Sequence, residues 1–397
     1  MNRRDLLALA AAAGPLVVAG RAFAVPPSGG SRLLVVFLRG AYDAANVLVP
    51  TTGDFYARAR PTIAIARPDP ANPDSAIPLT ADWGLHPALR ATLYPLWQKG
   101  QIAFAPYTGT DDMSRSHFET QDTIELGQPI GVERNFGSGF LGRLVGALGG
   151  AQPIAFTRQV PLTFQGGRPV ANFAVDSVGR TGVDSRQAKL IAEMYRGGDL
   201  AASVDEGFTV DNAVVGALAG EMTAASRGAV SAKGFALSAR RIGRLMRDRF
   251  NLAFVDVGGW DTHVGQGGAT GYLANRLDEL GQGLAGFADE IGQDAWKDTV
   301  VVVVSEFGRT FRENGDKGTD HGHGSVYWVL GGGVRGGRIL GDAGPVTEAS
   351  LNQNRDYPVL IDYRALLGGV FTGLYGLDRA RVEGVFPAAR PRDFGLV

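Results

Sequence analysis

Cysteine is absent from this chain of 397 residues. Its absence excludes disulfides, iron–sulfur clusters, thiolate metal sites and cysteine nucleophiles, so any metal must be held by histidine, aspartate or glutamate. An excess of charge of one sign is also missing, because 39 basic residues stand against 40 acidic ones. Without a basic excess to neutralise a phosphate backbone, nucleic acid is not an expected partner.

Long hydrophobic runs of membrane-spanning length are not found after the N-terminal region. Residues 1–24 combine an Arg3-Arg4 pair, an apolar stretch and the ending Ala22-Phe23-Ala24. This pattern is typical of a bacterial signal peptide of the twin-arginine type, which the twin-arginine export machinery reads. A membrane anchor is the alternative, but glycine and proline interrupt the short apolar stretch. We predict cleavage after Ala24, a linker over 25–31 and a periplasmic or secreted product without a stable membrane span.

Short apolar runs that recur along the chain are typical of strands buried on both faces. Amphipathic helical patterns lie between them, and this alternation predicts an α/β fold with a mostly parallel central sheet and helices on both faces. Ligands bind beyond the carboxyl ends of the strands in such a sheet. Strands are expected at 33–38, 101–107, 252–257, 299–305 and 325–330, and helices at 86–99 and 272–291.

The region from about 165 to 250 differs in composition from the rest. It is rich in glycine, alanine, serine and valine, with few large apolar residues before a helical pattern at 235–250. We interpret it as a helical excursion or cap over the sheet, within a single domain that spans 32–397. No repeat of 20 to 50 residues is visible, which excludes solenoids and propellers.

The clearest candidate site follows the predicted strand 299–305. Glu306 ends that strand, and a polar loop then presents Asp320, His321 and His323. Carboxylate and imidazole groups are the ligands that hold zinc, manganese or iron, and a His-x-His pair presents two imidazoles compactly. The alternative is a hydrogen-bonded surface loop.

A second candidate group, Asp261 and His263, comes just after the predicted strand 252–257. Its alternative interpretation is a turn in which Asp261 caps the next helix. Because the carboxyl ends of neighbouring parallel strands converge, we expect this pair and the residues near 320 to share a cation.

Serines precede a helical pattern in the third candidate segment. Ser116 and Glu119 have the spacing of a capping box, which is the structural interpretation. The functional interpretation is that a serine among the free N–H groups of a helix N-terminus favours a bound phosphate or sulfate and the attacking alkoxide. Ser114 is a second serine in the same segment, and His117 follows. Judged on sequence alone, Asp43 is a turn residue after the first strand.

Four segments together resemble an uncharacterised bacterial family, domain of unknown function 1501. In chain order they are LRGAYDAANVLVP, SRSHFETQD, VGGWDTH and SEFGRTFRENGDKGTDHGHG, which follow an exported N-terminus. That family is grouped by fold with the alkaline phosphatase and sulfatase superfamily. The resemblance implies a parallel α/β fold, a metal centre of carboxylates and histidines, and hydrolysis or transfer of phosphate or sulfate esters.

The resemblance also implies roles for individual residues. Asp43 is similar to the metal-binding aspartate after the first strand, and Ser116, or Ser114 as second choice, stands at the nucleophile position. Asp261 and His263 are similar to the ligands of one metal, completed by His321 or His323.

One position departs from the superfamily pattern. Glu306 stands where an aspartate followed by a histidine is usual, and here Phe307 follows. This departure puts the second metal in question, and Arg309 is expected to supply positive charge there instead, toward the group being transferred.

Two functions follow as hypotheses. The first is an exported hydrolase that uses a divalent metal ion (Zn, Mn, Mg or Ca) and a serine nucleophile on a small anionic ester of phosphate or sulfate. The alternative is a catalytically inactive relative that acts as an exported binding or assembly factor. The first hypothesis requires Asp261, His263, Asp320, His321 and His323 to meet around one point.

Overall fold

The computed structural model describes residues 30–175 and 234–397. The predicted signal peptide, most of the linker and the larger part of the predicted excursion therefore lie outside the described residues. None of the described helices is both long enough and apolar enough to span a membrane.

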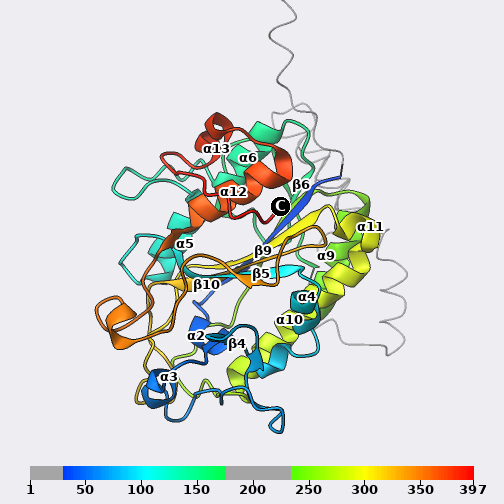
Figure 1. The fold of residues 1–397 in the computed structure, drawn as a ribbon. Helices are drawn as coiled ribbons and strands as arrows, with labels where there is room; N and C mark the ends of the chain where they lie inside the picture. Colours follow the sequence, from blue (N-terminus) through cyan, green and yellow to red (C-terminus); the bar gives the residue numbers. More distant parts are fainter. Residues whose placement is uncertain (1–29, 176–233) are drawn as a thin grey trace, which may run out of the picture.

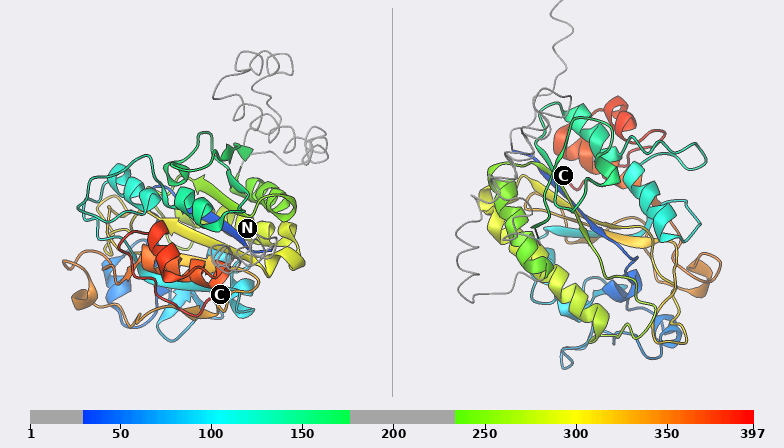
Figure 2. Two further views of the ribbon diagram at one scale, coloured as in Figure 1. Left: turned by 90° about the horizontal axis from the view of Figure 1, so that it is seen from above. Right: turned by 180° about the vertical axis from the view of Figure 1, so that it is seen from behind.

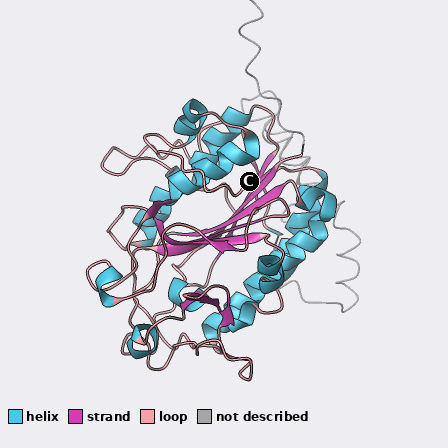
Figure 3. Ribbon diagram, viewed as in Figure 1, coloured by secondary structure: helices cyan, strands magenta, loops and turns pink. Residues whose placement is uncertain are grey.

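A central sheet organises the described chain, with the strand order β11-β5-β10-β9-β1-β8-β6-β7 and β12 beside β5. Most neighbouring strands are parallel, whereas β10 runs antiparallel to both β5 and β9. The predicted α/β fold with a mostly parallel sheet is confirmed (Figures 1 and 3). The strands are β1 (Arg32–Leu38), β5 (Ile102–Gly109), β6 (Pro153–Ala155), β7 (Ala171–Asn172), β8 (Leu252–Val257), β9 (Thr299–Ser305), β10 (Ser325–Leu330), β11 (Arg338–Ile339) and β12 (Ile361–Asp362).

Strand β1 shows why the apolar runs are continuous. Successive side chains of a strand point to opposite faces, so Leu34 and Val36 enter one hydrophobic cluster while Val35 and Phe37 enter the other. Both faces of the sheet are therefore covered, as the views in Figure 2 show. The first cluster includes α4 (Tyr94–Gln98), α9 (Phe235–Asp248) and α10 (Tyr272–Ile291), and the second includes α5 (His117–Leu126), α6 (Phe140–Leu148), α12 (Tyr363–Tyr375) and α13 (Arg379–Val385).

Smaller elements complete the described chain. A second sheet has the strand order β2-β4-β3. The elements are β2 (Leu48–Pro50), β3 (Ile77–Pro78) and β4 (Trp83–Leu85), the helices α2 (Ala44–Val47), α3 (Phe55–Ala59) and α11 (Gln293–Trp296), and 3-10 turns at Pro87–Leu89, Leu162–Phe164 and Glu348–Ser350.

The predicted helix at 86–99 is wrong. In its place the chain forms a 3-10 turn, Pro87–Leu89, and the short helix α4. Pro95 has no N–H to donate to a carbonyl one turn earlier, so it is accommodated only in the first turn of a helix, where it stands in α4. The helices expected at 235–250 and 272–291 are present as α9 and α10.

The sheet brings several chain segments to one edge. Strands β1, β5, β8 and β9 all point the same way, because β1 is parallel to β8 and β9 while β10 is antiparallel to both β9 and β5. Their carboxyl ends therefore share an edge with the start of β10. The residues that follow β5, β8 and β9 and the residues that precede β10 are consequently neighbours.

A buried histidine that follows β4 of the second sheet should make the stability depend on pH. His86 Nδ1 accepts the N–H of Ala88, and Nε2 lies 3.1 Å from the carbonyl oxygen of Gly268. Burial lowers the pKa of His86 to about 4. Below its ordinary pKa near 6.5 the unfolded chain binds a proton that the folded chain does not bind until about pH 4, so stability falls as the pH falls through this window.

We expect the His86→Asn variant to lose about 3 kcal/mol less of its unfolding free energy than the wild type between pH 7 and pH 4. Asparagine can still accept the capping N–H but does not titrate. Urea unfolding at several pH values measures the difference. If the unfolding free energies of the two proteins change in parallel with pH, His86 takes up its proton at the same pH in the folded and the unfolded chain, which contradicts the prediction.

Candidate metal centre

Three histidines and one aspartate converge at the carboxyl edge of the sheet. The Nε2 atom of His321 lies 3.0 Å from Nε2 of His117 and 3.0 Å from Nε2 of His263. Asp261 Oδ1 lies 3.0 Å from Nε2 of His263, and Oδ2 lies 3.6 Å from Nε2 of His117. We call His117, Asp261, His263 and His321 the histidine cluster.

Different elements supply the members of this cluster. His117 is the first residue of α5, in the connection after β5, and Asp261 and His263 follow β8. His321 lies just before β10, which starts at the same edge. The expected convergence of Asp261 and His263 with His321 is thus present in the structure.

The far nitrogen of each ring fixes its tautomer. Nδ1 of His117 lies 2.7 Å from a carboxylate oxygen of Glu306, and Nδ1 of His263 lies 3.2 Å from a carboxylate oxygen of Asp320. Nδ1 of His321 lies 2.9 Å from the carbonyl oxygen of Arg115. An ionised carboxylate or a carbonyl can only accept, so each Nδ1 must carry the hydrogen. A neutral ring then has a lone pair on Nε2. The lone pair of His321 therefore faces those of His117 and His263, an arrangement that a bound cation would stabilise.

Arg309 supports this assignment independently. Its Nη1 lies 3.4 Å from Nε2 of His263 and can only donate a hydrogen bond. Nε2 of His263 must accordingly be the acceptor.

Glu306 is buried directly behind His117. Although burial opposes its ionisation, hydrogen bonds from His117, from Gln121 and from the backbone N–H of Gly40 hold the pKa of Glu306 below its usual range. The Gln121 amide and the Gly40 N–H lie 2.9 and 2.8 Å from the same oxygen that faces His117. The expected metal ligand Glu306 is therefore used to orient a histidine, an arrangement that raises the basicity of metal ligands.

The charge of the region suits a divalent cation. Burial opposes ionisation of Asp261, but the hydrogen bond from Arg309, the charge of Arg309 and the neighbouring histidines together lower the pKa of Asp261. A hydrogen bond from Asn314 lowers the pKa of Asp320, and burial lowers the pKa of His321. With Glu306, three carboxylates stand against the guanidinium groups of Arg309 and Arg355, a net formal charge of −1 when the histidines are neutral.

The backbone of Arg115 is strained where it contacts His321. Its φ is +52°, a left-handed conformation that is costly for a residue with a side chain. The side chain is anchored by Asp356, which is fully buried and lies 3.1 Å from Nε of Arg115. This anchored turn directs the Arg115 carbonyl to Nδ1 of His321.

Arg309 has a different role from the expected one. All five of its N–H groups already have partners, so none remains to bind the group being transferred. The guanidinium instead joins the loops after β1 and β8 and the loop before β10. Its acceptors are the carbonyls of Gly40, Ala41 and Thr319, Nε2 of His263 and a carboxylate oxygen of Asp261.

Asp43 and His323, both expected as metal ligands, lie outside the histidine cluster. Arg60 donates to both carboxylate oxygens of Asp43, and Gln266 donates to one of them at 2.6 Å. Within 30–175 and 234–397, His117, Asp261 and His321 are the side chains whose ligand atoms all lie within 4.8 Å of one another. His263 is the fourth member of the cluster through its contacts of 3.0 Å with His321 and with Asp261. Asp320, a further expected ligand, lies behind His263 as Glu306 lies behind His117.

Ser116 has the position of a helix cap. It is the N-cap of α5, and its Oγ lies 3.5 Å from the N–H of Glu119. Glu119 pairs with Arg134 at 2.8 Å. Ser114 Oγ lies 3.3 Å from the N–H of Ser116. Ser116 directly precedes His117 in the chain, so it lies beside the cluster, and its role as nucleophile stays a prediction.

His117 was missed as a ligand in the sequence analysis. The segment was judged by its serines, and the capping pattern of Ser116 supplied a complete structural explanation. A usable signal was present, since His117 follows the predicted strand 101–107 and the carboxyl ends of parallel strands share an edge.

Residues 30–386 match a family described as a protein of unknown function, DUF1501. The chain belongs to this family. The family expected from the four sequence segments is thus confirmed. No curated protein matches the chain.

Two solved structures are similar to this DUF1501 protein at low identity. A protein in the alkaline phosphatase superfamily from Vibrio parahaemolyticus has 12% identity and a TM-score of 0.37, covering 88% of this chain and 68% of that one. A structure of Ps i-CgsB in complex with k-i-k-neocarrahexaose has 8% identity and a TM-score of 0.39, covering 89% of this chain and 74% of that one.

Glu306, which contacts Nδ1 of His117, offers a direct test of metal binding at the histidine cluster. We expect Glu306→Gln to weaken binding of Zn²⁺ by about 10- to 100-fold, because the amide no longer fixes the tautomer or raises the basicity of His117. Titration with a competing chelator measures the affinity. Glu290→Gln is the matched control, since Glu290 on α10 is a partly buried glutamate that pairs with Arg244 of α9. Equal losses in the two variants would contradict the positioning role of Glu306.

Proposed function

We propose that this protein is a metal-dependent hydrolase of phosphate or sulfate esters. The observation that supports the proposal most is the convergence of three imidazole Nε2 atoms, each with Nδ1 hydrogen-bonded to an acceptor, beside the Asp261 carboxylate. Nitrogen and oxygen donors of this kind suit Zn²⁺ or Mn²⁺.

The chain's residues divide between holding the cation and orienting its ligands. His117, His263 and His321 would hold it together with Asp261, and the cation would withdraw electron density from the ester oxygens and favour an ionised nucleophile. Glu306 and Asp320 keep two of the rings in the ligating tautomer.

Ser116 would supply the nucleophilic oxygen, with Ser114 as the alternative. The N-terminus of α5, which starts at His117, presents backbone N–H groups and the positive end of the helix dipole. These groups would favour a bound anionic ester beside Ser116.

Elemental analysis and ester turnover test this proposal together. We expect the purified protein to contain about one divalent ion per chain and to hydrolyse aryl phosphates or aryl sulfates, with loss of turnover after chelation and recovery on adding the metal back. Added metal should also raise the melting temperature, because it binds the folded state selectively.

Other results would reject the proposal. Absence of bound metal, together with no turnover of a phosphate and sulfate panel under added Zn, Mn, Mg or Ca, contradicts it. Bound metal without turnover would favour the alternative of an inactive binding or assembly factor.

Export through the twin-arginine route to the periplasm is a further part of the proposal, supported by the sequence of residues 1–24. Cell fractionation tests it in the native host. We expect the protein in the periplasmic or secreted fraction, and replacing Arg3 and Arg4 with lysine should retain it in the cytoplasm.

A further inference from the structure

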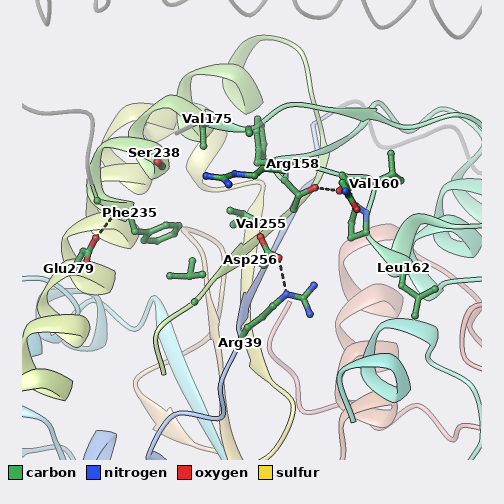
Figure 4. Close-up of a pocket in the computed structure, with 18 residues that line it drawn as sticks. Arg39, Arg158, Val160, Leu162, Val175, Phe235, Ser238, Val255, Asp256 and Glu279 are labelled. Carbon is green, nitrogen blue, oxygen red and sulfur yellow. Dashed lines mark hydrogen bonds and ion pairs between the residues drawn. The ribbon is translucent and has the colours of Figure 1, made fainter. Parts of the chain in front are cut away.

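A cavity of about 730 Å³ lies at the same edge of the sheet as the histidine cluster. Figure 4 shows it between the end of β8, the loop after β6 and the start of α9. Its lining includes Gly258, three residues before Asp261, and Arg39, whose neighbour Gly40 donates to Glu306. Ligand pockets have volumes of roughly 300 to 1,000 Å³, so the cavity has the size of a binding site.

Hydrogen bonds connect the cavity to the histidine cluster. Arg39 Nη1 lies 2.9 Å from Oε1 of Gln121, and the Gln121 amide nitrogen lies 2.9 Å from the Glu306 oxygen that faces His117. One side chain of the cavity wall is thus held by the same network that orients a cluster histidine.

The charges around Arg39 disfavour binding of an anionic group in the cavity. Asp256 and Glu125 each lie 2.8 Å from its guanidinium, so two carboxylates surround one positive charge. Arg158 and Glu279 add one charge of each sign to the lining. An anionic ester group would therefore bind at the histidine cluster, and the cavity suits a neutral group.

Arg39 and Asp256 also offer a donor beside an acceptor. Three of the five N–H groups of Arg39 have the partners Asp256, Gln121 and Glu125, so others remain. Oδ2 of Asp256 accepts from Arg39, whereas Oδ1 has no partner in the part of the chain that the structure describes. A hydroxyl group both donates and accepts a hydrogen bond, so it can satisfy both residues at once.

The remaining wall is partly apolar. Phe156, Phe235 and Val255 line the cavity and would cover the carbon skeleton of a ligand. Ser238, on α9, adds a further hydroxyl group. A compound with several hydroxyl groups on a ring of carbon atoms matches this mixture of polar and apolar wall.

We propose that this cavity binds a neutral, hydroxyl-rich organic group. The second step, that this group is the alcohol part of an ester whose acidic end lies at the histidine cluster, rests on the proposed hydrolase function.

Binding of free hydroxyl-rich compounds tests the cavity without requiring turnover. The probes are myo-inositol, glucose and maltose, with glucuronate as an anionic counterpart of glucose, titrated calorimetrically into the full mature protein. We expect at least one neutral probe to bind, glucuronate to bind more weakly than glucose, and Asp256→Ala to weaken binding of the neutral probe by at least 10-fold. The surface variant Asp248→Ala, at the end of α9, should bind as the wild type does.

Metal content and turnover separate the two proposals. The Asp256→Ala protein should keep its bound metal, which shows that it is folded. Probe binding without turnover of any ester supports the cavity and rejects the hydrolase. Three results would overturn the cavity proposal and leave the hydrolase proposal intact. They are turnover of phenyl phosphate without binding of any neutral probe, unchanged probe binding in Asp256→Ala, and tighter binding of glucuronate than of glucose.

Discussion

Replacing His321 with alanine is expected to lower metal affinity and ester turnover by more than about 100-fold, since loss of a direct ligand should exceed the loss caused by an outer partner. His321 is the central member of the histidine cluster, because its Nε2 lies 3.0 Å from Nε2 of both His117 and His263. Elemental analysis of the purified variant and steady-state kinetics on an aryl phosphate or sulfate measure the two losses.

His323→Ala is the matched control for this variant. It removes a histidine two positions away, whose backbone carbonyl accepts the Gly308 N–H. The control should bind metal as the wild type does, within about threefold. If instead His323→Ala loses the metal while His321→Ala keeps it, the assignment of the centre fails. Unchanged metal content in both variants would remove the basis of the proposed hydrolase.

Replacing Asp43 with alanine is expected to destabilise the fold by about 3–5 kcal/mol. The side chains of Asp43 and Arg60 are 1% and 0% exposed, so the variant leaves a buried guanidinium without its counter-charge. Among the described residues, the hydrogen-bond partners that Arg60 retains are the neutral groups of Asn46, Phe311 and Thr310. Urea unfolding measures the loss, and the metal content of the folded variant should stay at the wild-type value.

An exposed ion pair provides the control for Asp43. Asp54 and Arg67 are paired at the surface, with side chains 71% and 57% exposed. Asp54→Ala should change the unfolding free energy by less than about 1 kcal/mol, because solvent screens the pair. A fully stable Asp43→Ala protein that has lost its metal would restore the ligand role implied by the family resemblance.

The contrast between Asp43 and His117 shows how far sequence reasoning reached. Both follow strands whose carboxyl ends lie at the site, yet one side chain pairs with Arg60 and the other faces His321. The position of a residue after a strand indicates the correct edge of the sheet. It does not give the direction of the side chain, which depends on segments that are distant in sequence.

For the carboxylates Glu306 and Asp320, too, the sequence predicted the region but not the direction of the side chain. Glu306 and Asp320 were correctly expected near the histidines, since carboxylates and imidazoles recur in metal sites. Their place behind the rings follows from hydrogen bonds to Nδ1 that only the assembled loops allow. Arg309 was expected to face a substrate, but four backbone carbonyls surround it in the fold.

The sequence by itself determined the available chemistry and the class of fold. The lack of cysteine restricted metal ligands to nitrogen and oxygen donors, and apolar runs such as 299–305 specified strands buried on both faces. Only the tertiary structure decided which side chains meet, because His117 and His321 lie 204 positions apart and their contact depends on β10 running against β5 and β9. Local patterns record burial and helix caps, whereas the direction of a side chain in a shared site is set by the packing of every segment around it.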